Sequence, residues 1–273
     1  MVQALETLGH HVRKVDPQEP GWKLGSKTEV VFLALHGEYG EDGQVQKRLE
    51  QEGVPYTGTG IQGSRIAFDK ELTKYTFEKN DIPTPRWLML NDVREPVPAR
   101  LHAPWVLKPA RQGSSVGLQL VDDAGQWDTA LAAARKHDNR ILCEERIIGS
   151  EITVGILANE ALPIVEVSPK AGAYDYQNKY TVGATEYFCP ADLSTEQAEA
   201  TAKLGLKAFD AVGGRDFGRV DMMLDAELSP HVLEVNTLPG LTETSLLPMA
   251  AAAAGLDFNM LCQRMIELAL ERN

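Results

Sequence analysis

The chain has 273 residues, of which 43% are hydrophobic and 24% charged, so it has the composition of a globular protein with room for two or three lobes. Its 27 basic and 39 acidic side chains give a net charge of −12, which argues against a nucleic-acid partner because phosphate backbones require a basic face. Three scattered cysteines indicate free thiols in a reducing compartment. The absence of a long apolar run or leader-like N-terminus argues against a membrane or secreted protein, so we expect a cytoplasmic protein.

Residues 1–65 are predicted to form an α/β unit. Val2, Leu5 and Leu8 share one face of a short helix that ends at Gly9, and residues 11–15 are a predicted short strand. Units of this kind usually begin with a strand and a Gly-rich turn, whereas this chain begins in a helix. We therefore expect that a first strand is missing from the unit.

The middle of this unit contains a candidate ligand-binding segment. Residues 29–35, EVVFLAL, form a near-continuous apolar run, which is typical of a strand buried on both faces of a sheet. The polar segment HGEYGEDG at 36–43 follows directly, beyond the strand's carboxyl end, where open α/β sheets bind ligands. A helix is predicted over residues 44–52.

Residues 66–150 are predicted to form a second unit around the loop ARQGSSVG at 110–117. The loop joins a predicted strand at 105–109, which carries Lys108, to another at 118–121. Small and hydroxyl residues in a loop can hold phosphates through backbone N–H groups, but the loop is not a Walker A sequence and a plain hairpin turn is its simpler explanation. The other elements predicted in this unit are helices at 70–80 and 126–137 and a strand at 140–147.

Residues 151–273 are predicted to form a third unit. Residues 168–185, rich in Tyr, Lys and Gly, show no period, and a loop of this length inside a compact domain is often a lid over a site. A surface loop held by its tyrosines explains the same stretch equally well. The other elements predicted here are a strand at 151–157 and helices at 195–212, 245–254 and 257–271.

The segment 216–245 contains the clearest candidate metal-binding residues. Two apolar runs, GRVDMML and HVLEVN, flank the polar turn DAELSP and predict an antiparallel hairpin. Side chains two apart on a strand share a face, so Arg219 lies with Asp221 and Glu234 lies with Asn236. If the two faces coincide, two carboxylates and an amide oxygen meet, and such ligands suit Mg²⁺. A hairpin with a wet polar face is the alternative, but the Gly-containing tail and helix start that follow favour an anion-binding site.

In this order, the segments resemble those of the D-alanine–D-alanine ligases, a family of the ATP-grasp superfamily, over nearly the whole chain. The matching segments are LHGEYGEDGQVQ, GVPYTGTGI, FDKELTK, WVLKPARQGSSVGL, KAGAYDYQNKYTVGATEYFCPA, GRVDMML, LEVNTLPGLTETSLLP and the terminal helix. The resemblance implies an α/β fold with α+β lobes, namely the ATP-grasp fold with an N-terminal Rossmann-like lobe. The implied lobes are a truncated substrate lobe at 1–65, a central ATP-grasp lobe at 66–150, and a C-terminal ATP-grasp lobe at 151–273 with the lid and the metal hairpin.

The resemblance implies ligation of two D-alanines to D-alanyl-D-alanine for peptidoglycan synthesis, by way of a D-alanyl phosphate formed with ATP. It also implies two Mg²⁺ or Mn²⁺ ions and a homodimer that binds neither nucleic acid nor membrane. The implied ligands of the metals are Asp221, Glu234 and Asn236. The residues implied to hold ATP are Lys70, Lys108 and Lys179 at the phosphates, Glu144, Glu145 and Ile147 at the adenine, and Glu151 at the ribose. The residues implied to act on the amino acids are the lid pair Ser114 and Tyr180, the oxyanion-hole pair Arg219 and Gly240, His36 near the first D-alanine, and Ser245 and Leu246 at the carboxylate of the second.

One departure from the family leaves alternatives open. The family begins with a strand and a Gly-rich segment whose Glu contacts the first D-alanine and completes the Ser–Tyr link, and we find no counterpart in this chain. A nucleotide-binding protein without ligase activity is therefore one alternative, and a ligase that uses D-lactate as its second substrate is another. The presence of nearly all the ATP and metal residues argues against the first. Tyr180 argues against the second, since the ester-forming relatives tend to carry Phe in its place.

Overall fold

A computed structural model of the chain describes residues 1–92, 95–170, 184–242 and 244–272. Its strands are β1 (Trp87–Leu90), β2 (Trp105–Pro109), β3 (Gln119–Val121), β4 (Ile141–Glu145), β5 (Ser150–Leu157), β6 (Glu160–Ala161), β7 (Val165–Pro169), β8 (Thr185–Phe188), β9 (Phe217–Leu224) and β10 (Pro230–Asn236). Its helices are α1 (Val2–Thr7), α2 (Gln44–Glu52), α3 (Ile61–Phe68), α4 (Lys70–Lys79), α5 (Trp127–Ala134), α7 (Thr195–Ala211), α8 (Leu246–Ala253) and α9 (Phe258–Leu270), with a 3-10 helix η1 (Ala124–Gln126).

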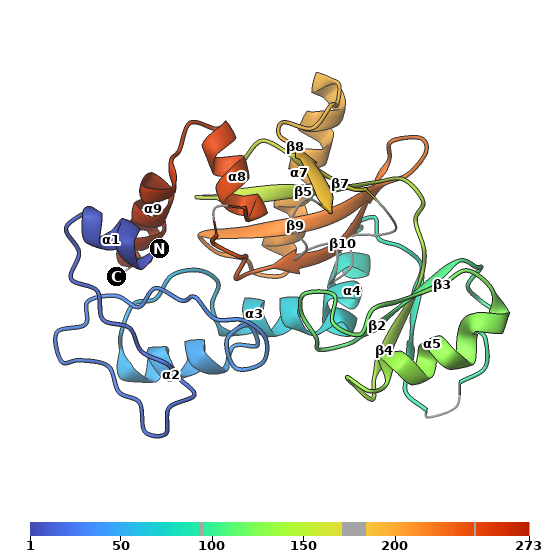
Figure 1. Ribbon diagram of the computed structural model, residues 1–273, viewed down its shortest axis with the longest axis horizontal. Helices are drawn as coiled ribbons and strands as arrows, with labels where there is room; N and C mark the ends of the chain where they lie inside the picture. The colour runs from blue at the N-terminus through green and yellow to red at the C-terminus, as the bar shows by residue number, and fades with distance from the viewer. Residues whose placement is uncertain (93–94, 171–183, 243, 273) are drawn as a thin grey trace.

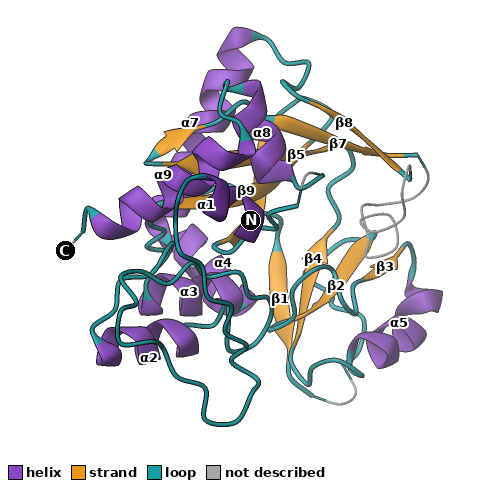
Figure 2. Cartoon of the chain, turned by 60° about the vertical axis from the view of Figure 1, so that its left-hand side comes forward, coloured by secondary structure: helices purple, strands orange, loops and turns teal. Residues whose placement is uncertain are grey.

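Two antiparallel sheets form the framework. The smaller has four strands in the order β1-β4-β2-β3, and the larger has six strands in the order β10-β9-β5-β7-β8, with β6 paired to β5. Figure 1 shows the smaller sheet at one end of the molecule, the larger sheet in the middle, and the N-terminal segment with α1 and α2 at the other end. Figure 2, turned by 60°, shows the strands of the two sheets as separate layers with α5 on the outside of the smaller one.

The larger sheet is covered on both faces. On one face, Val154 of β5 and Val220 of β9 pack in one cluster with Phe209 of α7 and Phe77 of α4. On the other, residues of α8 and α9 such as Leu247 pack against β5 and β7. The long helix α7 begins where its sequence predicts, since Ser194 and Gln197 form a capping box. Burial on both faces fixes the register of the central strands.

Helix α5 packs on one face of the smaller sheet, and α4 contacts the other face at Trp87 of β1 and Glu144 of β4. Leu107 of β2 packs with Trp127 and Leu131 of α5, and the rings of Trp105 and Trp127 meet edge to face at 5.5 Å. Because side chains alternate along a strand, Lys108 points to the opposite face, toward the larger sheet. The space between the two sheets therefore receives polar side chains of the smaller one.

Two predicted strands of the N-terminal unit are wrong. Residues 29–35 form only an isolated parallel bridge, between Val31 and Tyr56. Within the run only Leu33 is fully buried, and it packs against Leu49 of α2 and Tyr56 instead of lying between flanking strands. An apolar run signals burial, and burial can come from a helix and a loop as well as from a sheet. Residues 11–15 are also irregular.

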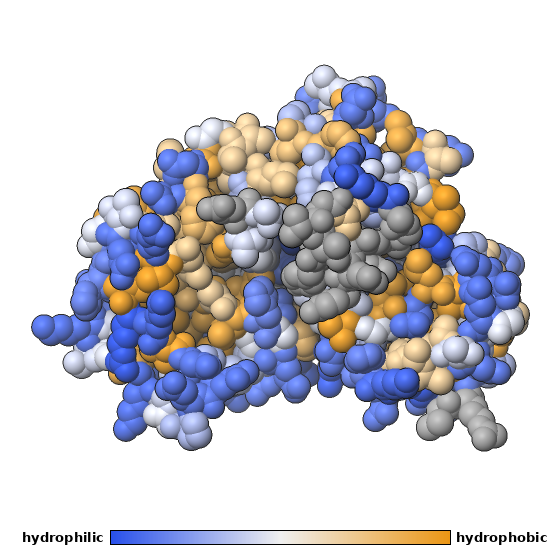
Figure 3. All heavy atoms as spheres, in the orientation of Figure 1, coloured by the Kyte–Doolittle hydropathy of each residue, from blue (hydrophilic) through white to orange (hydrophobic). Residues whose placement is uncertain are grey.

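Most other predicted elements are confirmed, including α2 with its bounds, β2, α4, α7 and the hairpin of β9 and β10. Strands β1, β7 and β8 and helix α3 were not predicted from the sequence. The predicted lid loop lies for the most part outside the described residues, although its two ends pair as β7 and β8, with Pro169 opposite Thr185. None of the helices in the described part of the chain is long and apolar enough to cross a membrane, and hydrophilic side chains are spread over the face seen in Figure 3.

Candidate active site

Two adjoining cavities hold every candidate residue that the structure describes. The first, of about 380 Å³, lies between the smaller sheet and the face of β9 and β10. The second, of about 580 Å³, lies between the segment that contains His36, the loop at 112–114 and the segment at 237–246. Lys70, Gln112 and Glu234 line both cavities. Two ligands bound side by side would therefore meet at these three residues.

The hairpin brings the four polar residues predicted from the sequence to one face. Glu234 lies opposite Asp221, and Asn236 lies opposite Arg219, in the antiparallel register of β10 and β9. Directly opposed residues point to the same side of a sheet, with Cβ atoms roughly 4.5–5.5 Å apart. A register irregularity between Val232 and Glu234 interrupts the ladder beside the cavity. The predicted coincidence of the two faces is thus confirmed.

The buried carboxylate of Asp221 has partners in the described part of the chain. Arg219 donates two hydrogen bonds of 2.8 Å to its two oxygens, and Thr153 Oγ1 donates one of 2.6 Å to Oδ1. The neighbouring carboxylate of Glu234 lies 3.7 Å from Lys70 Nζ. Cations of the chain thus offset both acidic groups, as a low-dielectric site requires.

The donor set on this face fits a hard divalent cation. Asp221, Glu234 and Asn236 offer only carboxylate and amide oxygens, the ligands that Mg²⁺ prefers, and leave coordination positions for water or phosphate oxygens. Within the described ranges, no group of three His, Cys, Asp or Glu side chains has metal-binding geometry. A metal at this face would therefore depend on the amide of Asn236 or on ligand oxygens to complete its coordination.

A buried ion-pair network lies at the other side of the first cavity. Lys108 Nζ lies 2.5 Å from Glu144 Oε2, and Lys74 Nζ pairs with Glu144 Oε1. Burial alone would raise the pKa of Glu144, but the two lysines outweigh it and lower that pKa to about 2. Burial would lower the pKa of Lys108, but Glu144 and Glu234 outweigh it and the net pKa is raised. Glu144 and Lys108 therefore carry charge at neutral pH, and Lys74, whose net pKa is lowered by burial, is paired with the charged Glu144.

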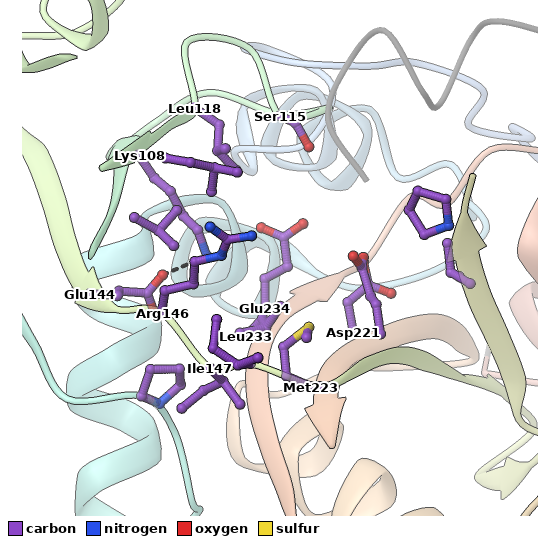
Figure 4. Close-up of a pocket in the computed structure, with 18 of the residues that line it drawn as sticks. Lys108, Ser115, Leu118, Glu144, Arg146, Ile147, Asp221, Met223, Leu233 and Glu234 are labelled. Carbon is purple, nitrogen blue, oxygen red and sulfur yellow. Dashed lines mark ion pairs between the residues drawn. The ribbon is translucent and has the colours of Figure 1, made fainter. Parts of the chain in front are cut away.

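The rest of the first cavity combines apolar walls with a further cation. In Figure 4, Ile147, Met223 and Leu233 lie along one side, while Asp221 and Glu234 point into the space from β9 and β10. Apolar walls of this kind suit a flat aromatic ring. Figure 4 also shows Arg146 among the residues that line the cavity, although no sequence pattern had singled it out.

The two glutamates predicted at the adenine are placed differently from each other. Adjacent residues on β4 point to opposite faces, so Glu144 faces the two lysines whereas Glu145 turns away from them. The Glu145 carboxylate accepts a 2.8 Å hydrogen bond from the backbone N–H of His102. Glu151, predicted at the ribose, lines the first cavity on β5.

The loop at 110–117 has the backbone of a binding loop. Ser114 and Ser115 have φ values of 53° and 59°, in the left-handed region that side chains other than glycine rarely adopt. Each such residue costs roughly 1–3 kcal/mol and tends to occur at functional sites. Lys70 Nζ donates a 2.7 Å hydrogen bond to the carbonyl of Gln112, so the first residue of α4 holds this loop in place.

The second cavity contains an acidic residue that sequence reasoning missed. Glu41 lines it together with His36, and its side chain accepts a hydrogen bond from the backbone N–H of Gly37. Burial is the main cause that raises the pKa of Glu41 from 4.5 to about 7, and the nearby charge of Glu234 adds to it. The signal was present in the segment HGEYGEDG, but nothing in the residue pattern separated Glu41 from its acidic neighbours.

The far wall of the second cavity is built around Ser245. Thr242 N–H donates to Ser245 Oγ at 3.0 Å, and the hydroxyls of Thr242 and Ser245 lie 2.8 Å apart. A Cβ at Gly240 would lie 2.9 Å from Ser245 Oγ, so a side chain at this position would displace the Ser245 hydroxyl. Leu246 begins α8 directly after Ser245. Lys179 and Tyr180, predicted on the lid, lie outside the described residues.

Comparisons with known proteins point to one family. The model of the D-ala D-ala ligase C-terminus matches residues 76–267, and that of the N-terminus matches residues 6–59. A D-alanine–D-alanine ligase of Methylacidiphilum infernorum is 44% identical over 98% of this chain and 88% of its own length. One of Aromatoleum aromaticum is 41% identical over 98% and 88%.

Solved structures agree with these matches. The D-alanine–D-alanine ligase of Bacillus anthracis superimposes with a TM-score of 0.82 at 36% identity, over 90% of this chain and 82% of its own. The same enzyme complexed with ATP superimposes with a TM-score of 0.78 at 34% identity, over 89% and 80%. The expected ATP-grasp fold is thus confirmed.

Proposed function

Because the chain belongs to the D-alanine–D-alanine ligase family, we propose that it joins two D-alanines to D-alanyl-D-alanine for peptidoglycan synthesis, with ATP converted to ADP and phosphate. The observation that carries this proposal is the pair of adjoining cavities that share Lys70 and Glu234. One combines an apolar wall with cations such as Lys108, as a nucleotide requires, and the other is large enough for two small amino acids. Phosphoryl transfer would take place where they meet.

The reaction has two steps. A carboxylate oxygen of the first D-alanine attacks the γ-phosphorus of ATP, a bond to phosphorus forms, and ADP leaves. The amine of the second D-alanine, having lost a proton, then attacks the carbonyl carbon of D-alanyl phosphate. The carbon–nitrogen bond forms and inorganic phosphate leaves. Both steps build negative charge on oxygen, which positioned cations and N–H groups stabilise.

On the nucleotide side, Lys70 and Lys108 would hold phosphate oxygens. The apolar wall that includes Ile147 and Leu233 would take the adenine, and Glu151 the ribose hydroxyls. Mg²⁺ would be held by the oxygen donors of the hairpin, and when bound it would neutralise the charge that grows on the transferring phosphoryl group.

On the amino-acid side, Arg219 and the backbone N–H of Gly240 would stabilise the oxyanion of the second step. Ser245 and Leu246 would bind the carboxylate of the second D-alanine through the N-terminal end of α8, where N–H groups and the helix dipole favour an anion. The first D-alanine would lie near His36 and Glu41, since both line the same cavity. Ser114 would contact the lid when the lid covers the site.

The family resemblance also leads us to propose a homodimer in the cytoplasm. The free thiols of Cys143, Cys189 and Cys262 support a reducing compartment. Light scattering of the purified protein at several concentrations tests the dimer, and a mass of about 30 kDa at all of them would contradict it.

The ligase activity is tested by incubating the purified chain with ATP, Mg²⁺ and D-alanine, and measuring ADP and dipeptide together. We expect ADP formation that depends on D-alanine and equals the D-alanyl-D-alanine formed. ADP formation at a rate that does not depend on D-alanine, or ATP binding without turnover, would contradict the proposal. L-alanine serves as the matched control substrate, because it has the same groups in the opposite configuration.

A further inference from the structure

Lys74 is a charged residue in the interior for which the proposed reaction has no role. Its side chain is 1% exposed, and it lies on α4 four residues after Lys70. Residues four apart share a face of a helix, so both ammonium groups point from α4 toward the cavities. Burying an ammonium group without a partner is costly, so its position calls for an explanation.

The partners of Lys74 join it to the nucleotide cavity. Its Nζ contacts Glu144 Oε1 and Thr84 Oγ1, and the other oxygen of Glu144, Oε2, lies 2.5 Å from Lys108 Nζ. Figure 4 shows this last ion pair at the edge of the cavity, with Lys108 on the cavity side of Glu144. Each oxygen of one carboxylate is thus taken by a different lysine. Lys74 lies behind the pair, and Lys108 is 12% exposed in front of it.

The three charges sum to one positive charge. Two ammonium groups and one carboxylate leave a net charge of +1. Lys108 and Glu144 both line the cavity, and Lys108 is the more exposed of the two, at 12% against 1%. Without Lys74, Glu144 would neutralise Lys108 and the network would have no net charge. Burial lowers the pKa of Lys74, and Glu144 opposes that shift only in part, so the ammonium form of Lys74 depends on its ion pair with Glu144.

We propose that Lys74 is a positioning residue that neutralises Glu144, so that Lys108 keeps its full positive charge for the phosphates of the nucleotide. This inference rests on the proposed role of the first cavity. It differs from a packing role, because a packing residue would affect the base and the phosphates alike. It also differs from a role in which Lys74 only holds Thr84 in place. The Thr84 hydroxyl contacts Lys74 Nζ and donates a 2.7 Å hydrogen bond to the carbonyl of Val232, so it connects α4 to β10.

The test compares Lys74→Met with the double variant Lys74→Met/Glu144→Gln. Methionine keeps the apolar stem and removes the charge, so the network falls from +1 to 0. The double variant removes one charge of each sign and restores +1 on Lys108. Exchange of a buried ion pair for neutral residues is often tolerated by a fold. Lys79→Met, which removes an exposed lysine from the end of the same helix, is the matched control.

The measurement is the affinity for ADP and for adenosine, by calorimetric titration of the full chain in Mg²⁺. One charge acting over about 10 Å at an effective dielectric constant of about 20 changes affinity by roughly tenfold. We therefore expect Lys74→Met to weaken ADP binding about tenfold, or ~1.4 kcal/mol, while adenosine binding changes by less than about twofold. The double variant should have a ratio of ADP to adenosine affinity within about threefold of the wild type.

Three results would overturn the inference. Equal loss of ADP and adenosine affinity in Lys74→Met would indicate a packing role, and a double variant as defective as the single one would indicate the link through Thr84. Circular dichroism will show whether Lys74→Met folds. If it does not, the double variant is the test, and a fall of about tenfold in its ratio of ADP affinity to adenosine affinity would overturn the inference. A wild-type chain that binds neither ligand would instead refute the nucleotide site itself.

Discussion

The start of helix α4 offers a quantitative test of how the site is supported. Asp69, 4% exposed, caps the helix by accepting hydrogen bonds from the N–H groups of Glu71 at 3.1 Å and Leu72 at 3.3 Å. The same carboxylate accepts from Arg111 Nε at 2.8 Å and Arg140 Nη1 at 3.1 Å. Burial would raise its pKa, but these donors outweigh it and the net pKa is lowered. Asp69 therefore joins the helix start to two other segments.

The cost of removing this carboxylate can be estimated from its contacts. Loss of an N-cap costs about 1 kcal/mol, and loss of a charge-assisted bond to the partly buried Arg140 costs roughly 1.5–3 kcal/mol. Arg111 is 60% exposed and adds little. Asp69→Ala should therefore lower the free energy of unfolding by roughly 2–4 kcal/mol. Asp69→Asn keeps an acceptor for the cap and should lose only about 1–2 kcal/mol.

The substitution of Asp69 should also weaken ATP binding at the nucleotide site. The N–H of Lys70, the first residue of α4, donates a 3.0 Å hydrogen bond to the carbonyl of Ala110, and its Nζ holds the loop at Gln112. Asp69→Ala should raise the KM for ATP more than Asp69→Asn does, with a smaller effect on the KM for D-alanine. Urea unfolding and steady-state kinetics measure the two quantities. An Asp69→Ala protein within about 0.5 kcal/mol of the wild type would refute the reasoning.

Three further predictions follow from the site. Asp221→Asn should reduce kcat for ADP formation by about 10²-fold or more with the fold intact, because the donor set loses a charge, and wild-type turnover at ordinary Mg²⁺ would contradict the metal assignment. Tyr180→Phe should raise ester formation with D-lactate relative to dipeptide, and equal yields of both from the wild type would contradict the predicted role of Tyr180. The pKa of Glu41 is raised in the folded state, so its contribution to stability is present below pH 4.5 and is lost as the pH rises through about 7. The midpoint of urea unfolding should fall over that pH range in the wild type and change less in Glu41→Gln. The same pH dependence of the midpoint in both proteins would contradict the raised pKa of Glu41.

The sequence predicted the hairpin of β9 and β10 because strand alternation is a local property. Arg219 with Asp221, and Glu234 with Asn236, are two residues apart, so their shared faces follow from the strand period alone. The register that brings the two pairs opposite each other agrees with the short turn between the strands. The tail around Ser245 was predicted for the same reason, because its glycine and hydroxyl residues are close in sequence.

Other features depend on contacts that no local pattern contains. The run at 29–35 was predicted to be buried on both faces, but only Leu33 is fully buried, by α2 and Tyr56 instead of neighbouring strands. Glu144 was expected at the adenine from family resemblance, and its carboxylate is held by two lysines, one of them 70 residues away in the chain as Lys74. Burial and partners of this kind are set by tertiary packing, which a single sequence leaves open.

The central claim is that the carboxylate of the first D-alanine attacks the γ-phosphorus of ATP. Transfer of oxygen tests it directly, because the attacking oxygen stays with phosphorus when the amine displaces phosphate. The chain is incubated with ATP, Mg²⁺ and D-alanine labelled with ¹⁸O in its carboxylate, and the released phosphate is analysed by mass spectrometry. The mechanism predicts one ¹⁸O atom in the phosphate for each D-alanyl-D-alanine formed. Unlabelled phosphate released together with the dipeptide would contradict it.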